Sequence, residues 1–188
     1  MGHSLGSTLS INLAHKHPKM VKGLIAIDPV FPKALTGQLR LLKNLKPVLP
    51  IGVAGLRTLY KLGFGRKKIP VRDLNEMDKQ AREFLEQNDK EALVDLCMST
   101  KEDLKYIRLA NYIQDLNIVL AGLPPLEEIP QKTLVLLSQG ASISNFEVNQ
   151  KFIKQLPNQV TTVIDADHWM LIERPNETRE AIESWLRK

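Results

Sequence analysis

The sequence predicts an α/β fold in which a doubly wound, mostly parallel sheet carries a helical insertion. Two observations predict it: short apolar strands alternate with helices at both ends of the chain, and the middle shows helical patterns without convincing strands. With 188 residues and 43% hydrophobic content, the chain is long enough to bury a sizeable core. We therefore expect core segments at residues 1–32 and 130–188, and a helical insertion at residues 33–129.

The first core segment is predicted to be a helix followed by a strand. Leu5, Leu9 and Leu13 recur at helical spacing, and Pro18 ends that pattern. Residues 21–27 then form a short run rich in branched apolar residues, which is typical of a buried parallel strand. A helix followed directly by a strand leaves no room for a hairpin here.

The insertion is predicted to consist of helices. Apolar residues at helical spacing form two patches, at residues 39–45 and 53–62. Asp73 with Glu76, and Ser99 with Glu102, then resemble capping boxes, each followed by apolar residues on one helical face. Those faces extend to residues 85 and 113, and two consecutive prolines close the insertion at residues 124 and 125.

The second core segment returns to alternating strands and helices. Residues 133–137 and 160–164 are predicted strands, with a helix at 146–156 between them. His168 follows the second strand directly, and Pro175 begins a final helix. Catalytic side chains of such sheets occur in the loops after the strands, so we expect the catalytic residues there.

The segment Gly2-His3-Ser4-Leu5-Gly6 fits the pattern G-x-S-x-G at the start of a helix. Small flanking residues permit a tight turn that lifts the serine hydroxyl above the sheet. Backbone N–H groups at the start of the helix face developing negative charge, and that of Leu5 is the expected oxyanion donor. The motif makes Ser4 the candidate nucleophile.

His168 is the candidate general base. A histidine in a loop after a buried strand can reach a serine at the same edge of the sheet, and a neutral imidazole is the usual base for a hydroxyl. The alternative is a histidine that merely ends a strand. His15 and His17 are expected at the surface, whereas His3 is placed to line the site.

These segments resemble the α/β-hydrolase fold family, in the order in which that family has them. The resemblance covers about half of the chain and rests on residues 2–7, 17–29, 133–137 and 167–177. It implies a serine esterase or lipase type of hydrolase, in which Ser4 attacks an ester or related acyl carbonyl and His168 transfers the proton. His3 and Trp169, beside these two residues, are the expected substrate contacts, and the helical insertion is the expected cap.

The acid of the triad departs from the family pattern. The usual acid follows the strand at residues 133–137, but the first carboxylate after that strand is Glu147. Some relatives carry the acid after the preceding strand, where Asp28 lies, and a carboxylate there could orient the imidazole. Asp28 is therefore the predicted acid. Asp165 and Asp167 are too close to His168 in sequence to be comfortable partners.

The strands that precede the elbow in the family have no counterpart in this sequence. Met1 alone precedes Gly2, and the loop that supplies the second oxyanion N–H is missing. We therefore expect an N-terminally truncated chain, whose three predicted strands expose a sheet edge. The alternative to an active hydrolase is accordingly a catalytically inactive fragment or binding module with the same fold.

Positive charge is concentrated in the insertion. Residues 33–72 contain ten Lys or Arg residues and no Asp or Glu, whereas the whole chain has a net charge of +5. A solvated helical face is the simplest interpretation. A basic, apolar cap that makes weak contact with a membrane surface or an anionic substrate is the sharper one. Nucleic-acid binding is not expected, because few aromatic residues and no binding motif accompany these charges.

Few other partners are indicated. Cys97 is the sole cysteine, so an internal disulfide is excluded and no Cys/His cluster at metal-ligand spacing occurs. No cofactor motif is present, because the glycines at 52 and 55 lack the strand–turn–helix context of a dinucleotide site. No signal peptide is recognisable, and we expect a cytoplasmic protein that acts on a small-molecule acyl or ester substrate. The oligomeric state is not indicated.

Overall fold

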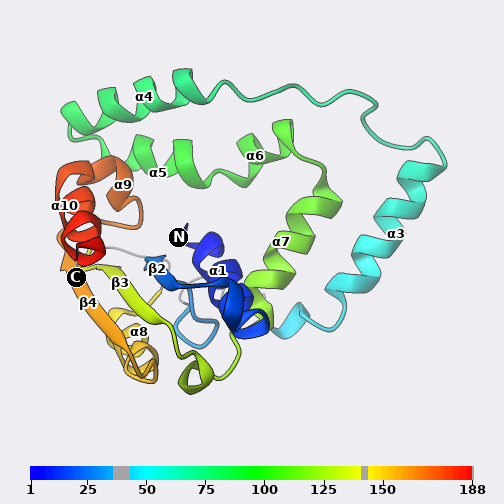
Figure 1. Cartoon of the computed structure of the whole chain (residues 1–188). Helices are drawn as coiled ribbons and strands as arrows, with labels where there is room; N and C mark the ends of the chain where they lie inside the picture. The colour runs from blue at the N-terminus through cyan, green and yellow to red at the C-terminus, as the bar shows by residue number, and fades with distance from the viewer. Residues whose placement is uncertain (36–42, 141–143, 188) are drawn as a thin grey trace. The chain divides into compact units, whose positions relative to one another are not determined.

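The computed structural model describes residues 1–35, 43–140 and 144–187 and divides into two compact units (Figure 1). The first unit comprises Met1–Lys46 and Ile118–Lys188, and the second comprises Pro47–Asn117. The apolar patch predicted at 39–45 falls mainly on residues 36–42, which lie outside the described residues. The first unit carries the sheet, and the described elements of the second are helices.

The sheet of the first unit has four parallel strands in the order β1-β2-β3-β4. Their bounds are Gly2–His3, Gly23–Ile27, Lys132–Ser138 and Gln159–Ile164. The predicted parallel α/β fold is confirmed, with strand ends shifted by one or two residues. Strand β1 was not predicted, because two residues are too few to show an apolar pattern.

Helices cover both faces of this sheet. They are α1 (Leu5–Lys16), α8 (Phe146–Ile153), α9 (Met170–Glu173) and α10 (Pro175–Leu186). Short 3-10 turns occur at Pro18–Met20, Lys43–Leu45 and Leu126–Glu128.

Alternate residues of the central strands pack on opposite faces of the sheet. Leu24 of β2 and Val135 of β3 pack with residues of α1 and α8, such as Ile11. Ile25 and Leu134, one position along each strand, pack on the other face with residues of α9 and α10. Both faces are buried because successive side chains of a strand point to opposite sides.

The second unit is built from helices, and side chains cap the starts of three of those described. They are α3 (Leu49–Lys61), α4 (Leu74–Glu86), α5 (Lys90–Met98), α6 (Thr100–Tyr106) and the first part of α7 (Leu109–Ala121). Side chains of Asp73, Asp89 and Ser99 accept hydrogen bonds from backbone N–H groups in the first turn of the following helix.

The apolar face predicted after Ser99 is not one helix. Ile107 adopts an extended conformation, with φ of −126° and ψ of 157°, and separates α6 from α7. Helix α5 between Asp89 and Ser99 was not predicted as a separate element. Among the described residues, no helix is long and apolar enough to cross a membrane.

Candidate active site

Ser4 lies in a strained turn between β1 and α1. Its φ of 51° and ψ of −118° are unusual for a residue with a side chain, and its N–H donates a 2.9 Å hydrogen bond to the carbonyl of Ile27 in β2. Gly2 is required here, because a Cβ atom at this position would lie 2.1 Å from the carbonyl oxygen of Gly6. Gly6 itself has no such neighbour, so sterics explain only the first glycine of the motif.

The hydroxyl of Ser7 braces the same turn. It contacts the carbonyl oxygens of Gly2 and Ile27 at 2.6 and 2.9 Å, and the side chain is fully buried. These two carbonyls belong to neighbouring strands, so Ser7 links the turn to the sheet at a point where the backbone is strained.

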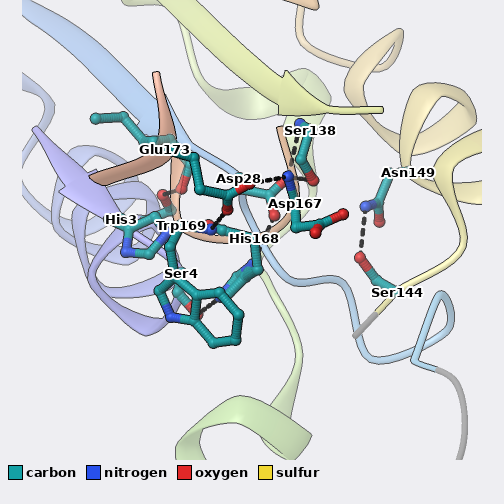
Figure 2. Close-up of polar contacts among 12 residues, drawn as sticks. His3, Ser4, Asp28, Ser138, Ser144, Asn149, Asp167, His168, Trp169 and Glu173 are labelled. Carbon is teal, nitrogen blue, oxygen red and sulfur yellow. Dashed lines mark hydrogen bonds and ion pairs between the residues drawn. The ribbon is translucent and has the colours of Figure 1, made fainter. Parts of the chain in front are cut away.

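Ser4, His168 and Asp28 form a continuous hydrogen-bonded chain (Figure 2). Nε2 of His168 lies 2.9 Å from Oγ of Ser4, and Nδ1 lies 2.6 Å from Oδ2 of Asp28. Because an ionised carboxylate only accepts hydrogen bonds, Nδ1 donates to Asp28, which leaves Nε2 of a neutral ring to accept from the Ser4 hydroxyl. The imidazole is thereby held in the tautomer that a base for Ser4 requires.

Asp28 is buried at the end of β2. Its φ of 43° lies in the left-handed region, which Asp adopts more readily than most residues with a side chain. The second carboxylate oxygen, Oδ1, accepts hydrogen bonds from the backbone N–H and the hydroxyl of Ser138, at 3.1 and 2.9 Å. Ser138 ends β3, so residues at the carboxyl ends of two adjacent strands fix this carboxylate.

The other carboxylates considered from the sequence occupy different surroundings. Glu147 is exposed in the first turn of α8, and Asp165 is exposed just after β4. Asp167 lies in the loop that carries His168. This loop comes so close to the loop after β3 that a Cβ atom at Gly140 would lie 2.2 Å from an Asp167 carboxylate oxygen. The carboxylate that contacts Nδ1 of His168 is therefore that of Asp28.

Glu173 and His3 hold the loop around His168. The two carboxylate oxygens of Glu173 accept hydrogen bonds from the backbone N–H groups of Asp167 and Trp169, at 2.9 and 3.1 Å. Nε2 of His3 donates to the backbone carbonyl of His168 at 2.8 Å (Figure 2). These contacts fix the backbone N–H groups of the residues on both sides of His168, and the carbonyl of His168 itself.

The two expected substrate contacts both lie beside His168. The ring centroid of His3 is 4.9 Å from that of His168, and burial lowers the pKa of His3 below its usual value. The indole of Trp169 meets the His168 ring edge-on, with centroids 5.8 Å apart. Contact of either residue with a substrate stays a prediction.

The backbone N–H of Leu5 lies at the start of α1, directly after Ser4. The first N–H groups of a helix have no acceptor within the helix and carry a partial positive charge. This position suits an oxyanion formed next to Ser4. The role remains a prediction, as it was from the motif.

Three supporting residues were missed from the sequence: Ser7, Ser138 and Glu173. Ser7 contacts the carbonyl of Ile27 and Ser138 contacts the carboxylate of Asp28, both distant in sequence, whereas Glu173 accepts a hydrogen bond from the N–H of Asp167 across a turn. A single Ser or Glu also carries no periodic signal in the sequence. Ser7 and Glu173 lie inside segments that resemble the family, and this resemblance is the signal that could have singled them out.

A family model described as the alpha/beta hydrolase fold matches residues 1–175. The chain belongs to the α/β-hydrolase fold family. The match covers the segments predicted at 1–32 and 33–129 and residues 130–175 of the second core segment, and it confirms the resemblance inferred from the two ends of the chain. No curated protein matches the chain significantly.

Solved structures of other α/β hydrolases share the fold. A hydrolase from Pseudomonas aeruginosa is 16% identical with a TM-score of 0.59, and the alignment covers 98% of this chain and 63% of that one. A thermophilic esterase from Thermogutta terrifontis is 20% identical with a TM-score of 0.59, and the alignment covers 99% and 63%. An N-acyl homoserine lactone degrading enzyme is 20% identical with a TM-score of 0.58, and the alignment covers 97% and 65%.

This α/β hydrolase therefore spans a little under two thirds of the length of these three structures. At identities of 16–20% the comparison establishes the fold. Substrate and activity must be argued from the residues at the carboxyl ends of the strands.

Proposed function

We propose that this α/β hydrolase cleaves carboxylic esters or related acyl compounds through a triad of Ser4, His168 and Asp28. The observation that carries the proposal is the unbroken hydrogen-bonded chain from Oγ of Ser4, through both nitrogens of His168, to Oδ2 of Asp28. Its three side chains come from the ends of three parallel strands, so the sheet holds them in register.

In the first step, Oγ of Ser4 attacks the carbonyl carbon while its proton passes to Nε2 of His168. The carbonyl oxygen becomes an oxyanion, which the N–H of Leu5 stabilises. The ester bond then breaks, and the proton on Nε2 passes to the departing alkoxide, which leaves as an alcohol. The acyl group remains on Ser4.

In the second step, water attacks the acyl carbon and gives a proton to Nε2 of His168. The bond to Oγ of Ser4 breaks, the proton returns to Oγ, and the carboxylic acid leaves. Asp28 stays ionised throughout and stabilises the imidazolium that forms in each step, so His168 serves once as base and once as acid in each half of the reaction.

Two features support an acyl substrate. Serine is a nucleophile for carbonyl carbon, whereas displacement at an alkyl carbon in this fold needs a carboxylate nucleophile. The structural neighbours include a thermophilic esterase and an enzyme that degrades N-acyl homoserine lactones.

A fluorophosphonate probe and a short p-nitrophenyl ester test the proposal directly. The probe should phosphonylate Oγ of Ser4 with release of fluoride, and peptide mapping should locate the adduct there. Ser4→Ala should abolish labelling and lower kcat by about 10⁶-fold. Ser10→Ala, on the helix that follows the elbow, is the matched control and should leave both unchanged.

The competing proposal is a non-catalytic module with the same fold, since the chain spans about 63% of the length of the esterase. A chain that unfolds cooperatively in urea, yet takes up no probe at Ser4, would favour that module and overturn the hydrolase. Labelling that persists in Ser4→Ala would overturn the assignment of the nucleophile.

A further inference from the structure

The outer side of α3 and the turn that follows it expose several large apolar side chains. Ile51 is 72% exposed, and Leu62 and Phe64, in the turn after the helix, are 68% and 65% exposed. We refer to Ile51, Leu59, Leu62 and Phe64 as the apolar edge. All four belong to the second compact unit, and the segment from Leu62 to Asp73 is a loop without helix or strand (Figure 1).

The apolar edge lies opposite the side of α3 that packs within its own unit. Val53 is buried, whereas Ile51, two residues earlier, points about 160° away from it around the helix axis. Ile51 and Leu62 are eleven residues apart, close to three full turns, so they lie along one face. Exposed apolar side chains that lie together favour an interaction site, so this face of α3 is a candidate docking surface.

Positive charge is concentrated in the segment that carries the apolar edge. Residues 47–72 contain six Lys or Arg residues and no Asp or Glu. The three arginines are engaged within the unit: Arg57 with Gln114, Arg66 with backbone carbonyls before α7, and Arg72 with Asp103.

The three lysines of this stretch differ from the arginines. Lys61, Lys67 and Lys68 are exposed and form no salt bridge with any residue that the structure describes. They flank Leu62 and Phe64 on both sides in sequence. Exposed apolar side chains are therefore framed by cations whose charge is not neutralised locally.

The turn that presents Leu62 and Phe64 is well defined. The N–H of Gly63 donates to the carbonyl of Tyr60 at 3.1 Å, and the N–H of Phe64 donates to the carbonyl of Leu59 at 3.0 Å. Arg108 also stacks over the ring of Tyr60, with 5.4 Å between the guanidinium carbon and the ring centroid. The apolar side chains of the turn are therefore held outward by a backbone that already has its hydrogen bonds.

We propose that the apolar edge and its three lysines form a docking surface for an anionic lipid membrane. Leu62 and Phe64 enter the boundary between headgroups and acyl chains, while Lys61, Lys67 and Lys68 pair with lipid phosphates and carboxylates. A nucleic acid or an acidic protein with a polar surface would satisfy the lysines but leave the apolar side chains exposed, so the combination favours lipid. Docking would bring an acyl hydrolase to a surface rich in acyl substrates.

Sedimentation with vesicles tests the docking surface in the full chain. We expect binding to vesicles in which about a third of the lipid is phosphatidylserine, and much weaker binding to pure phosphatidylcholine. Replacing Lys67 and Lys68 together with Gln should weaken binding about 25-fold, because each cation near an anionic surface contributes about a factor of five. Replacing Leu62 and Phe64 with Ser should weaken it at least tenfold.

Matched variants on the first unit are the controls. Lys151→Gln with Lys154→Gln removes two exposed lysines from α8 and its cap, and Met20→Ser with Leu186→Ser removes two exposed apolar side chains. Both should bind within about twofold of the original chain. Urea unfolding of every variant shows whether the fold is kept.

Three outcomes would overturn the proposal. One is equal binding to neutral and anionic vesicles. Another is a loss of vesicle binding on changing Lys151 and Lys154 that equals the loss on changing Lys67 and Lys68, which would mean that net charge alone matters. The third is binding to duplex DNA or polyglutamate that is tighter than binding to the anionic vesicles and that persists when Leu62 and Phe64 are changed to Ser. That result would assign the surface to a soluble polyanion or an acidic protein.

Discussion

Ser138 donates two hydrogen bonds to one carboxylate oxygen of Asp28, from its backbone N–H at 3.1 Å and its hydroxyl at 2.9 Å. This leaves the other carboxylate oxygen to face Nδ1 of His168 at 2.6 Å. The family usually places its acid in the loop that follows the strand ending at Ser138. Here that strand end holds the carboxylate of Asp28, the proposed acid, which follows the neighbouring strand.

Ser138 should therefore act as a positioning residue in the proposed hydrolase. Ser138→Ala removes the hydroxyl contact but keeps the backbone one, so Asp28 stays near His168 with one restraint fewer. Hydrogen bonds to charged groups contribute about 1.5–3 kcal/mol, and we expect kcat to fall about tenfold with KM nearly unchanged. Steady-state hydrolysis of a p-nitrophenyl ester measures both constants.

A threonine at position 138 separates positioning from simple packing. Ser138→Thr keeps the hydroxyl in a buried strand end and should recover most of the lost kcat. If Ala and Thr variants have the same kcat as the original chain, the hydroxyl does not orient Asp28. If both lose activity together with cooperative unfolding, the residue contributes only to stability.

Asp28 itself can be tested against the carboxylate that the usual family position would suggest. Asp28→Asn keeps the size of the side chain but removes the charge that stabilises the imidazolium, and the neutral amide can favour the wrong histidine tautomer. A loss of kcat on the order of 10⁴-fold is expected. Glu147→Gln, a change of the same kind on an exposed residue, should keep kcat within about twofold. The reverse ranking in ester hydrolysis would make Glu147 the acid.

The sequence predicted the parts of this site that depend on local patterns. Ser4 was recognisable because G-x-S-x-G implies a particular turn, and His168 because it follows a predicted strand. That strand, β4, was expected to be buried, but Val160 and Val163 are exposed and Ile164 is buried. Asp28 was named as the acid, and its carboxylate contacts His168. That role stays a prediction until a variant is measured.

The parts that local patterns could not predict depend on neighbours distant in sequence. Strand β1 exists because Gly2 and His3 pair with Ala26 and Ile27, and two residues carry no period of their own. The contact of Ser138 with Asp28 spans 110 positions in the chain. The break at Ile107 interrupts a helical period that the sequence continues across it.

The two glycines of the elbow should tolerate substitution very differently. A Cβ atom at Gly2 would lie 2.1 Å from the carbonyl oxygen of Gly6, a contact that the turn cannot relieve without moving. Gly2→Ala should therefore abolish fluorophosphonate labelling of Ser4 and lower the free energy of unfolding by several kcal/mol. Urea titration and gel-based labelling measure the two effects.

Gly6→Ala is the matched control for this prediction. No atom outside the local helix backbone approaches a Cβ at Gly6 within 4 Å, and alanine favours a helix over glycine by about 1 kcal/mol. Labelling should persist, and the free energy of unfolding should stay the same or rise. Equal effects of the two substitutions would mean that the elbow is not held by the close approach at Gly2.

His3 should make stability depend on pH below neutrality. Burial lowers the pKa of its imidazole below the ordinary value of 6.5, so the unfolded chain takes up this proton at a higher pH than the folded chain does. The free energy of unfolding should therefore fall as the pH drops below about 6.5. The amide of His3→Gln can still donate to the carbonyl of His168, and this variant should lose part of that decline. His17→Gln, at an exposed position, is the control and should keep the decline. Urea titrations at pH values above and below 6.5 measure the free energy of unfolding of each variant. A steeper decline in His3→Gln would show that the folded chain favours protonated His3.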